Sequence, residues 1–524
     1  MAWPLADHGV LCEFGTRIEP DLSQRIAWLA DDLVALEPPG LIDVVPSYTT
    51  LLLIVQPGTT RIPHILDAIA YLWPEIAERP IAVGGREVVI PVVYGGESGP
   101  DLPDVARQSG LEPAEVTRRH HEATYRVGAI GFSPGFAYLT GLPPELATPR
   151  RATPRVRVPV GSVGIGGAQT GVYTCPTPGG WSLIGRTELR LFDAEREPPA
   201  LLAVGDRVRF SQAPARIVPE RVSPRPVAAA RHDRAFLEIV QPGLLTTVQD
   251  LGRPGYGRIG VAPGGAADKA ALVRGNWLVG NPDGAAGLEM TIGGPHVRFL
   301  RPGRVVVSGA HLGARLNGIP LPVEAVRVVK PGDDLTFDGS ARRGARAYLC
   351  VAGGIDVPER LGSRSTDLIG QFGGHEGRPL KRGDRLAAGP VAEPWVRVRL
   401  EPITPNAWPI RVVRGPQANR FDEKSWKSLV EREFTVSSES NRQGIRLDGP
   451  LILPGGATDI VSQGVVTGAI QVTGSGQPIV MLPARATIGG YPQIATVIAA
   501  DLDRMGQLKP GDTVRFTEEL GVVE

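Results

Sequence analysis

The phrase Val204-Gly-Asp-Arg-Val-Arg-Phe210 recurs along the chain and indicates its fold class. Its echoes are Lys330-Pro-Gly-Asp-Asp-Leu-Thr-Phe337, Lys381-Arg-Gly-Asp-Arg-Leu386 and Lys509-Pro-Gly-Asp-Thr-Val-Arg-Phe516. In each copy the Gly-Asp pair supplies a turn, and the alternating residues after it predict a strand with one buried face. The copies are too unevenly spaced for a solenoid. They indicate the closing hairpins of several small β-barrels or sheets.

The composition agrees with a chain of many short strands. The 66 Gly and 50 Pro suit strands joined by tight turns. A chain of 524 residues is too long for one ordinary core, and size priors suggest roughly three or four domains. The 56 Lys and Arg nearly cancel the 55 Asp and Glu, so we expect no nucleic-acid partner.

Cysteine usage and the N-terminus bear on the compartment. Cys12, Cys175 and Cys350 are widely spaced, which predicts neither a disulfide framework nor a zinc site, and no metal ligand is assigned. Met1 to His8 lacks the pattern of a signal peptide, and no apolar run approaches the roughly 18 residues of a membrane span. We expect a cytoplasmic protein without a membrane partner.

The Pro- and Arg-rich segment from Gln212 to Arg234 is the clearest linker and divides the chain into two modules. Helical periodicity occurs in four stretches, of which two lie in the first 85 residues. The first 85 residues therefore read as α+β, and the remainder reads as mainly β with short helices. The expected fold class is therefore mainly β with some α+β.

A dense run from Tyr125 to Thr187 combines glycines, arginines and aromatic residues, and predicts the wall of a small-molecule cleft. Glycines let the backbone approach a ligand, and arginines can bind a carboxylate or phosphate with two hydrogen bonds. Aromatic rings can wall an apolar pocket, and a glutamine can hold an amide. The alternative is a set of glycine-rich turns with surface arginines. The candidate binding residues are Arg151, Arg155, Gln169, Tyr173, Trp181 and Arg186.

The second module carries three comparable clusters, around Asp250, around Arg364 and around Asn441. Hydroxyl and guanidinium groups between glycines can cradle an oxyanion, although turns with solvated polar residues would look the same. The candidate binding residues are Arg253, Arg364, Arg378, Asn441, Arg446, Gln471 and Tyr491.

No catalytic residue can be named from the sequence, and His120 and Asp250 are the candidates. His120 could act as a general base, or could simply end a helix. Asp250 could orient an arginine or bind Mg²⁺ with a phosphate, or could cap a turn. The motifs GxxxxGK[ST], GxSxG and HExxH are absent, so any ATP site is not a P-loop.

Residues from about 10 to 212 resemble the B component of 5-oxoprolinase, also called allophanate hydrolase subunit 1. The resemblance rests on long phrases that include Gly131 to Leu139, Pro149 to Arg155 and Val158 to Tyr173. Residues from about 236 to 520 resemble the C component of the same enzyme, through phrases that include Thr247 to Tyr256 and Leu361 to Thr366.

The two modules together resemble the carboxyltransferase region of urea carboxylase. The chain departs from the pattern of the C component at Ala486 and Ile488, where the family has Gln and Thr, and this leaves the substrate open.

This resemblance implies a small α+β N-terminal domain and cyclophilin-like β-barrel domains in tandem. The implied boundaries are 1–85 for the small domain, 86–212 for a barrel, 213–235 for the linker, and 236–400 and 401–524 for two barrel halves.

The implied activity is that of a component of an ATP-dependent 5-oxoprolinase, a cyclic amide hydrolase that opens 5-oxoproline to glutamate. ATP with Mg²⁺ and a separate third subunit of the lactam-utilisation type would be required, and homo-oligomerisation is left open. One alternative is a biotin-dependent carboxyltransferase that acts on urea or a related amide, with biotin as its cofactor. Another is a regulatory protein that binds and inhibits a histidine kinase.

Overall fold

The computed structural model describes residues 1–59, 61–81, 86–214, 234–339, 343–391, 395 and 409–520. It is mainly β, with two closed seven-stranded barrels in tandem, which confirms the predicted fold class. Most of the predicted linker, residues 215–233, and the expected boundary near 400 lie outside the described residues. No helix in the described part of the chain is long and apolar enough to cross a membrane.

The N-terminal domain, residues 1–81, is a four-stranded antiparallel sheet with two helices. Its sheet order is β1-β2-β4-β3. In α1 the buried residues Ile26, Leu29 and Leu33 recur at helical spacing and pack into a core shared with α2 and the sheet. The elements are β1 (Ala2–Pro4), β2 (Gly9–Glu13), α1 (Pro20–Leu36), β3 (Leu41–Pro46), β4 (Thr50–Val55) and α2 (Ile62–Glu78).

Barrel 1, residues 86–214, closes in the order β10-β7-β6-β13-β5-β12-β9. Its last strand, β13, pairs in parallel with its first, β5, and that pairing leaves no open edge between them. The barrel strands are β5 (Glu87–Tyr94), β6 (Thr124–Ile130), β7 (Ala137–Thr140), β9 (Ser162–Gly166), β10 (Gln169–Val172), β12 (Ser182–Arg186) and β13 (Arg207–Gln212). Outside them lie α3 (Leu102–Ser109), α4 (Pro113–Glu122), η1 (Pro144–Leu146) and the ribbon of β8 (Arg155–Val158) and β11 (Thr177–Gly179).

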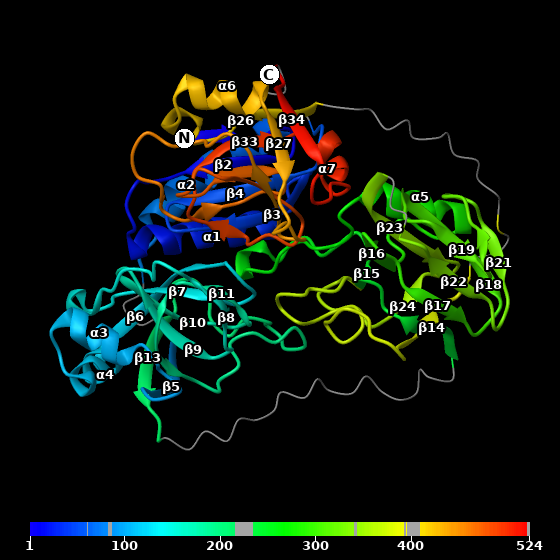
Figure 1. The fold of residues 1–524 in the computed structure, drawn as a ribbon. Coiled ribbons are helices and arrows are strands. Elements are labelled where there is room, and N and C mark those ends of the chain that lie inside the picture. Colours follow the sequence, from blue (N-terminus) through cyan, green and yellow to red (C-terminus); the bar gives the residue numbers. More distant parts are fainter. Residues whose placement is uncertain are drawn as a thin grey trace.

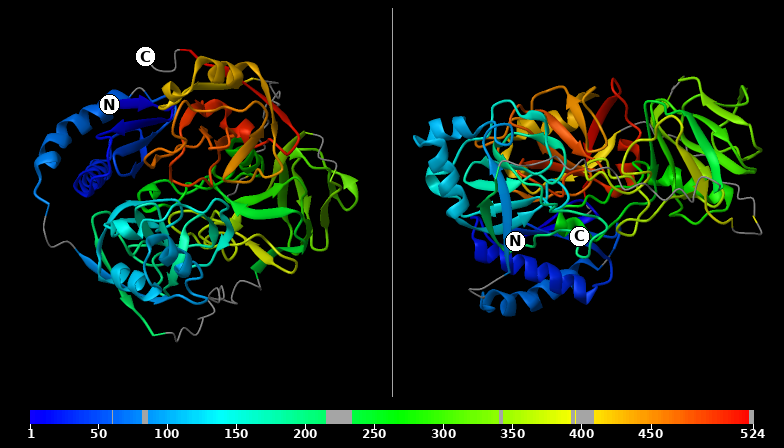
Figure 2. Two further views of the ribbon diagram at one scale, coloured as in Figure 1. Left: turned by 60° about the vertical axis from the view of Figure 1, so that its left-hand side comes forward. Right: turned by 90° about the horizontal axis from the view of Figure 1, so that it is seen from below.

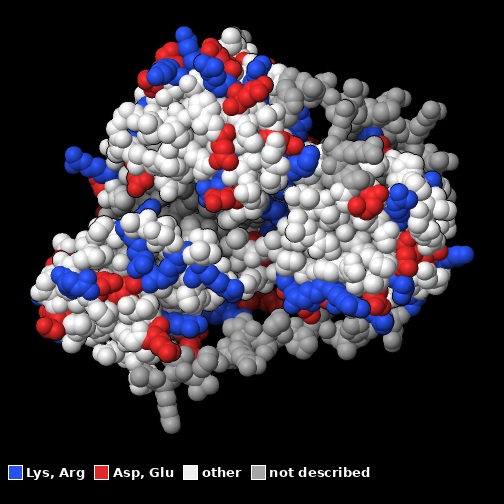
Figure 3. Space-filling model, in the orientation of Figure 1, with Lys and Arg blue, Asp and Glu red and all other residues white. Residues whose placement is uncertain are grey.

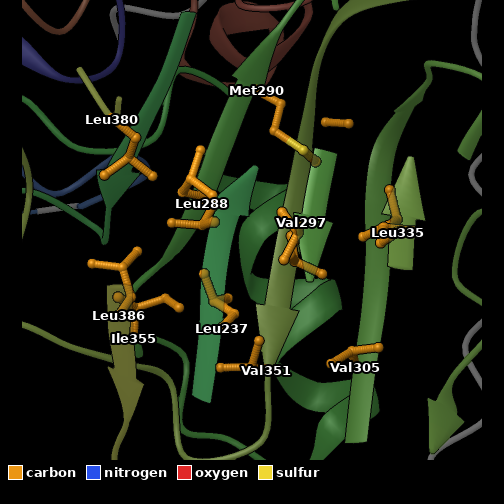
Figure 4. Packing of buried hydrophobic residues seen from close by; sticks show 14 of the residues in the cluster. Leu237, Leu288, Met290, Val297, Val305, Leu335, Val351, Ile355, Leu380 and Leu386 are labelled. Carbon is orange, nitrogen blue, oxygen red and sulfur yellow. The ribbon is translucent and has the colours of Figure 1, made fainter. Parts of the chain in front are cut away.

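The two-sheet unit, residues 234–391, differs from the barrel half expected at 236–400. The sheet β20-β19-β22-β17-β14-β25-β24 is open, because its end strands β20 and β24 do not pair with each other. It faces a second sheet, β15-β16-β23-β18-β21. Leu237, Leu288 and Val297 come from both sheets and meet in the core (Figure 4).

The elements of this unit are β14 (Ala235–Gln241), β15 (Leu245–Gln249), η3 (Gly257–Ile259), α5 (Lys269–Val279), β16 (Gly287–Thr291), β17 (His296–Phe299), β18 (Gly303–His311), β19 (Ala314–Leu316), β20 (Ile319–Pro320), β21 (Arg327–Val329), β22 (Asp334–Phe337), β23 (Arg343–Val351), β24 (Ile355–Asp356) and β25 (Arg385–Ala388).

Barrel 2, residues 409–520, repeats the closure of barrel 1 in the order β26-β33-β30-β31-β28-β27-β34, again with a parallel pair of its first and last strands. The barrel strands are β26 (Ile410–Arg414), β27 (Glu433–Val436), β28 (Gly444–Asp448), β30 (Ala469–Val472), β31 (Pro478–Met481), β33 (Gln493–Val497) and β34 (Thr513–Glu518). Around them lie η4 (Ala418–Arg420), α6 (Glu423–Glu431), α7 (Ala499–Met505), and the pair β29 (Gln463–Gly464) and β32 (Ile488–Gly489).

The recurring Gly-Asp phrase has one physical explanation in all four copies. Its glycines, Gly205, Gly332, Gly383 and Gly511, have φ of +92°, +90°, +88° and +87°. Only glycine adopts such a conformation without strain. Each following aspartate accepts a hydrogen bond from the backbone N–H three residues before it, at 2.7 to 3.0 Å. The strands β13, β22, β25 and β34 then begin within two residues.

The order of domains in space differs from their order in the chain. The N-terminal domain lies against barrel 2, at the opposite end of the sequence (Figure 1), and other views of the ribbon agree (Figure 2). Ser47 donates to the carbonyl of Ser462 at 2.5 Å, and Asp7 accepts from the N–H of Ala499 at 2.8 Å. One apolar core contains residues of the N-terminal domain and of both barrels.

A crossing segment, residues 253–266, ties the two-sheet unit to the other three domains. The N–H of Gly257 donates to Asp43 in the N-terminal domain at 3.1 Å. The carbonyl of Ile259 accepts from Gly135 of barrel 1 at 2.8 Å, and the N–H of Gly264 donates to Pro483 of barrel 2 at 3.0 Å. The second module is therefore held to the first through its own backbone.

Candidate functional site

The aromatic residues of the run from Tyr125 to Thr187 form one packed cluster. Neighbouring rings of Phe132, Phe136, Tyr138, Tyr173 and Trp181 meet edge to face, with centroids 4.9 to 6.4 Å apart. A Cβ at Gly166 would lie 2.3 Å from Nε1 of Trp181, so a glycine is required where that ring crosses β9. The cluster therefore builds a rigid apolar wall.

Polar groups gather beside this wall, and they come from two domains. The Gln169 amide donates to the hydroxyl of Tyr48 at 2.5 Å. Tyr48 lies between β3 and β4 of the N-terminal domain, and its ring meets that of Tyr138 at 6.2 Å. The Tyr138 hydroxyl has no hydrogen-bond partner among the described residues. We call Tyr48, Tyr138, Arg150 and Gln169 the Gln169 cluster.

Arg150 supplies a positive charge to this cluster. Burial raises the pKa of Tyr48, Tyr138 and Tyr173, the last to about 12, and the charge of Arg150 opposes that rise in all three. The hydroxyls stay protonated at neutral pH and can donate hydrogen bonds. Arg150 is exposed and makes no ion pair within the described ranges. An amide, a phenol and a free guanidinium thus lie together.

The other arginines predicted for the first module serve its internal structure. Arg151 and Arg155 both reach Oδ1 of the buried Asp101, at 3.1 and 2.7 Å. Arg186 donates to the carbonyl of Val160 at 3.1 Å. The structure therefore places Arg151 and Arg155 on a carboxylate of the protein itself, whereas their neighbour Arg150 makes no ion pair among the described residues.

His120 lies inside barrel 1. Its ring nitrogens hydrogen-bond with the hydroxyls of Tyr94, at 2.8 Å, and Thr170, at 3.0 Å. Burial lowers its pKa to about 3, so the imidazole stays neutral. The side chain is fully buried. The structure gives it a packing role and no path to a ligand.

Asp250 anchors a loop. Its carboxylate accepts hydrogen bonds from the N–H of Gly252, the N–H of Arg364, and the hydroxyls of Ser363 and Ser365. The carboxylate is thereby committed to holding the loop that follows β24, and Arg364 points instead to Glu359.

The remaining candidates of the second module are dispersed. Arg253 is buried, stacks on Phe372 at 4.8 Å and donates to the carbonyl of Ser365. Arg378 pairs with Asp384 and Glu376, and Arg446 lies 3.9 Å from Glu439. Gln471 donates to the carbonyl of Tyr491 at 3.3 Å. Asn441 lines a cavity between the two-sheet unit and barrel 2.

The modules meet beside the aromatic wall. Phe372 of the two-sheet unit packs against Phe192 of barrel 1 at 5.6 Å, and a Cβ at Gly370 would lie 3.2 Å from Pro134. Figure 3 shows a hollow where the lobes converge, with Lys and Arg side chains gathered on its rim over barrel 1. This location and charge suit a small anionic molecule.

The described residues contain no preformed cluster of metal ligands. No three His, Cys, Asp or Glu side chains among them are placed to hold a metal ion. Asp250, the candidate for that role, already receives four hydrogen bonds from the protein.

The sequence predicts Gln169 as a binding residue, with Tyr173 and Trp181 of the adjoining aromatic wall, but it predicts no role for Tyr48 or Arg150. Tyr48 is 121 residues from Gln169 and belongs to another domain, so only the fold brings them together. Arg150 stands beside Arg151 in one phrase, and nothing in the sequence indicates which of the two meets Asp101.

Comparison with known proteins gives two adjoining family matches. The family described as "Carboxyltransferase domain, subdomain C and D" matches residues 2–202, and the "subdomain A and B" family matches residues 259–518. The chain is 45% identical over 189 residues to the B component of 5-oxoprolinase from Escherichia coli O157:H7, covering 36% of this chain and 85% of that protein. It is 38% identical over 285 residues to the C component of 5-oxoprolinase from Escherichia coli K12, covering 54% and 91%.

The chain is also similar to a urea amidolyase and to a protein of known crystal structure. The urea amidolyase of Lachancea kluyveri is 36% identical over 308 residues, which cover 53% of this chain but 17% of that protein. The crystal structure of TTHA0988 in space group P212121 matches 99% of this chain and 100% of its own, at 35% identity and a TM-score of 0.82. A fusion of both subdomain pairs thus has a solved counterpart along its whole length.

Proposed function

The chain belongs to the carboxyltransferase-domain family, with the C/D subdomain pair before the A/B pair, and from this membership we propose that it serves as fused B and C components of a 5-oxoprolinase. The observation that carries the proposal is that one chain spans 85% of a B component and 91% of a C component. Both relatives are named for the same enzyme.

The Gln169 cluster supports this choice of substrate. 5-Oxoproline carries a carboxylate and a cyclic amide. Arg150 is a free cation for the carboxylate, and the Tyr138 hydroxyl and the Gln169 amide can hydrogen-bond the lactam. The aromatic wall of Phe136 and Trp181 would exclude water from one side of the ring.

The chain's own contribution is then to bind and orient the lactam. Hydrolysis adds water across the amide, breaks its C–N bond and gives glutamate. A neutral phenol near the carbonyl oxygen stabilises the negative charge that develops there. The proposed reaction also requires ATP with Mg²⁺ and a third subunit of the lactam-utilisation type. We assign none of the described residues to nucleotide binding.

The test is reconstitution. The purified chain is mixed with a lactam-utilisation-type subunit, ATP, Mg²⁺ and 5-oxoproline, and glutamate and ADP are measured. We expect both products to appear together and to require this chain. No glutamate with every part present would overturn the proposal.

Carboxyl transfer is the second candidate, favoured by the similarity to urea amidolyase and by the name of the family. Calorimetry separates the two. Saturable binding of free biotin with none of 5-oxoproline would favour transfer to urea or a related amide, whereas the reverse pattern favours lactam opening.

A further inference from the structure

Barrels 1 and 2 are built alike down to the register of their strands. Both connect seven strands in the same cyclic order, and in both a ribbon of two short strands, β8 with β11 or β29 with β32, lies outside the barrel. The ribbon leads into a Gly-Gly-aromatic phrase, which ends at Trp181 in barrel 1 and at Tyr491 in barrel 2. The strand after each phrase, β12 or β33, then pairs with β9 or β30 through a bulge. Trp181 and Tyr491 are therefore structural counterparts.

One row of residues crosses three neighbouring strands in each barrel. In barrel 1, Gly171 of β10 pairs with Gly164 of β9 on one side and with Tyr138 of β7 on the other. The counterparts in barrel 2 are Ile479, Gln471 and Arg446. Ile470 and Ile445, next to this row in the sequence, lie in the core of barrel 2. Because side chains alternate along a strand, Ile479, Gln471 and Arg446 face the outside of the barrel.

This outer face differs between the barrels. In barrel 1, Trp181 lies against glycines of β9, is 5% exposed and meets Tyr138 with ring centroids 5.9 Å apart. In barrel 2, Gln471 takes the place of one of those glycines, and Tyr491 is 37% exposed. Arg446 stands at the position of Tyr138. Barrel 2 therefore presents an amide, a guanidinium and an exposed phenol where barrel 1 has a packed apolar wall.

Gln471 offers a hydrogen-bond acceptor on this face. Its Nε2 donates to the carbonyl of Tyr491 at 3.3 Å. A carbonyl oxygen can only accept, so this bond fixes which end of the amide faces Tyr491. Oε1 has no hydrogen-bond partner within the described ranges and remains accessible to solvent, although the residue is only 3% exposed. Buried polar groups are normally paired, so this oxygen indicates a ligand that donates an N–H.

Arg446 offers hydrogen-bond donors on the other side of Ile479. Its guanidinium makes no hydrogen bond in the part of the chain that the structure describes, and its side chain is 38% exposed. Glu439 lies 3.9 Å away, and Asp448, two residues further along β28, accepts a hydrogen bond from Gln477 at 2.8 Å. With these two carboxylates near one guanidinium, a further negative charge is disfavoured. The donors of Arg446 therefore suit the carbonyl oxygen of a neutral ligand.

We propose that this outer face of barrel 2 is a second ligand site, which takes a small neutral molecule with an amide group. The ligand N–H donates to Oε1 of Gln471, its carbonyl accepts from the guanidinium of Arg446, and its body lies over Ile479 beside Tyr491. Two strand spacings place the Cα atoms of Gln471 and Arg446 roughly 10 Å apart, which leaves room for one small ring between the side chains. The site does not depend on the proposed lactam opening and shares no residue with the Gln169 cluster.

The test uses pyrrolidinone, a five-membered lactam, and butyrolactone, in which a ring oxygen replaces the N–H. The full chain carries Gln169→Leu, which removes the amide of the Gln169 cluster, so that failure here is distinct from failure of the proposed lactam opening. Binding is titrated by ligand-observed NMR. We expect pyrrolidinone to bind saturably, and butyrolactone to bind at least about tenfold more weakly, because it leaves Oε1 of Gln471 unpaired. No saturable binding of pyrrolidinone, or equal binding of the two rings, would overturn the proposal.

Two variants, made in the same chain, locate the site. Gln471→Met removes the acceptor and nearly keeps the shape of the side chain. Arg446→Met removes the donors at a partly exposed position, where little loss of stability is expected. Each should weaken pyrrolidinone binding about tenfold. Gln477→Met is the matched control, because Gln477 belongs to the same barrel and its amide is already bonded to Asp448. Unchanged binding in Gln471→Met or Arg446→Met, or an equal loss in Gln477→Met, would contradict the assignment.

Discussion

Arg150 and Arg151 are neighbours in sequence, yet the structure gives them different tasks. Arg151 shares the buried Asp101 with Arg155, whereas Arg150 is exposed and acts on three tyrosines through its charge. The residue types of this site could be predicted from the sequence, because aromatic, amide and guanidinium groups are dense there. The choice between the two arginines could not, since it depends on where Asp101 lies.

Replacing Arg150 should weaken substrate binding. Arg150→Met removes the charge but keeps much of the side-chain length, so we expect KM for 5-oxoproline to rise by about tenfold or more, as for a lost carboxylate contact. Steady-state kinetics of the reconstituted enzyme measure this. Arg157→Met is the control, because Arg157 is also exposed and lies in the same segment. Equal effects of the two changes would contradict a specific role for Arg150.

Asp43 should make stability depend on pH. Burial raises its pKa to about 6, above its ordinary 3.8, so the folded protein binds this proton more tightly than the unfolded chain. The bound proton on Asp43 therefore stabilises the folded protein. This contribution to the free energy of unfolding is complete below about pH 4 and is lost as the pH rises through 6. Relative to Asp43→Asn, the wild-type free energy of unfolding should fall by up to about 1.4 kcal/mol per pH unit in that window. Urea titrations at several pH values measure the difference, and parallel pH profiles would argue against a buried, titrating Asp43.

At the scale of elements, the Gly-Asp phrase was the most informative part of the sequence. Its four copies precede β13, β22, β25 and β34, because a glycine at positive φ and an aspartate bonded three residues back define one turn. The phrase could not predict closure. Two copies end closed barrels, and two belong to an open sheet, since closure depends on which distant strands pair.

Gly332 tests this explanation. A Cβ there would meet no atom within 4 Å, so the cost of Gly332→Ala should be the backbone strain at φ +90°, roughly 1–2 kcal/mol. Gly293→Ala is the matched control, because a Cβ at Gly293 is equally free and the backbone there is not at positive φ. Denaturant unfolding compares the two. A neutral Gly332→Ala, or equal losses in both variants, would contradict the account.

Asp250 tests the role of a side chain as an anchor. Asp250→Ala leaves two backbone N–H groups and two hydroxyls without their acceptor, so we expect a loss of about 3 kcal/mol or more in the free energy of unfolding. Chemical denaturation measures this loss. A variant as stable as the wild type would mean that the loop after β24 is held by other contacts.

At the scale of the whole molecule, the linker between the modules does not separate them in space. The N-terminal domain packs on barrel 2, and the crossing segment joins the two-sheet unit to the other three domains. Ion pairs of 2.7 Å, Arg258 with Asp31 and Arg360 with Glu195, add to this interface. The hydrophobic periodicity of the sequence could not predict this packing of domains, because the core of each domain by itself accounts for the apolar pattern of its own strands and helices.

The two modules should therefore assemble without the linker. We expect residues 1–214 and 234–524, produced as separate chains in one cell, to co-purify as a one-to-one complex. A shared apolar core that spans both modules would be exposed if they separated. Size-exclusion chromatography with mass determination measures this, and independent elution of two stable, soluble modules would contradict it.

Glutamate formation in the reconstituted mixture is compared between the wild-type chain and Gln169→Leu. Gln477→Leu is the control, because Gln477 is a surface glutamine bonded to Asp448. We expect glutamate from 5-oxoproline with the wild type and with Gln477→Leu, and a rate about 10²-fold lower with Gln169→Leu. Glutamate formed equally well by Gln169→Leu, or by none of the three, would contradict it.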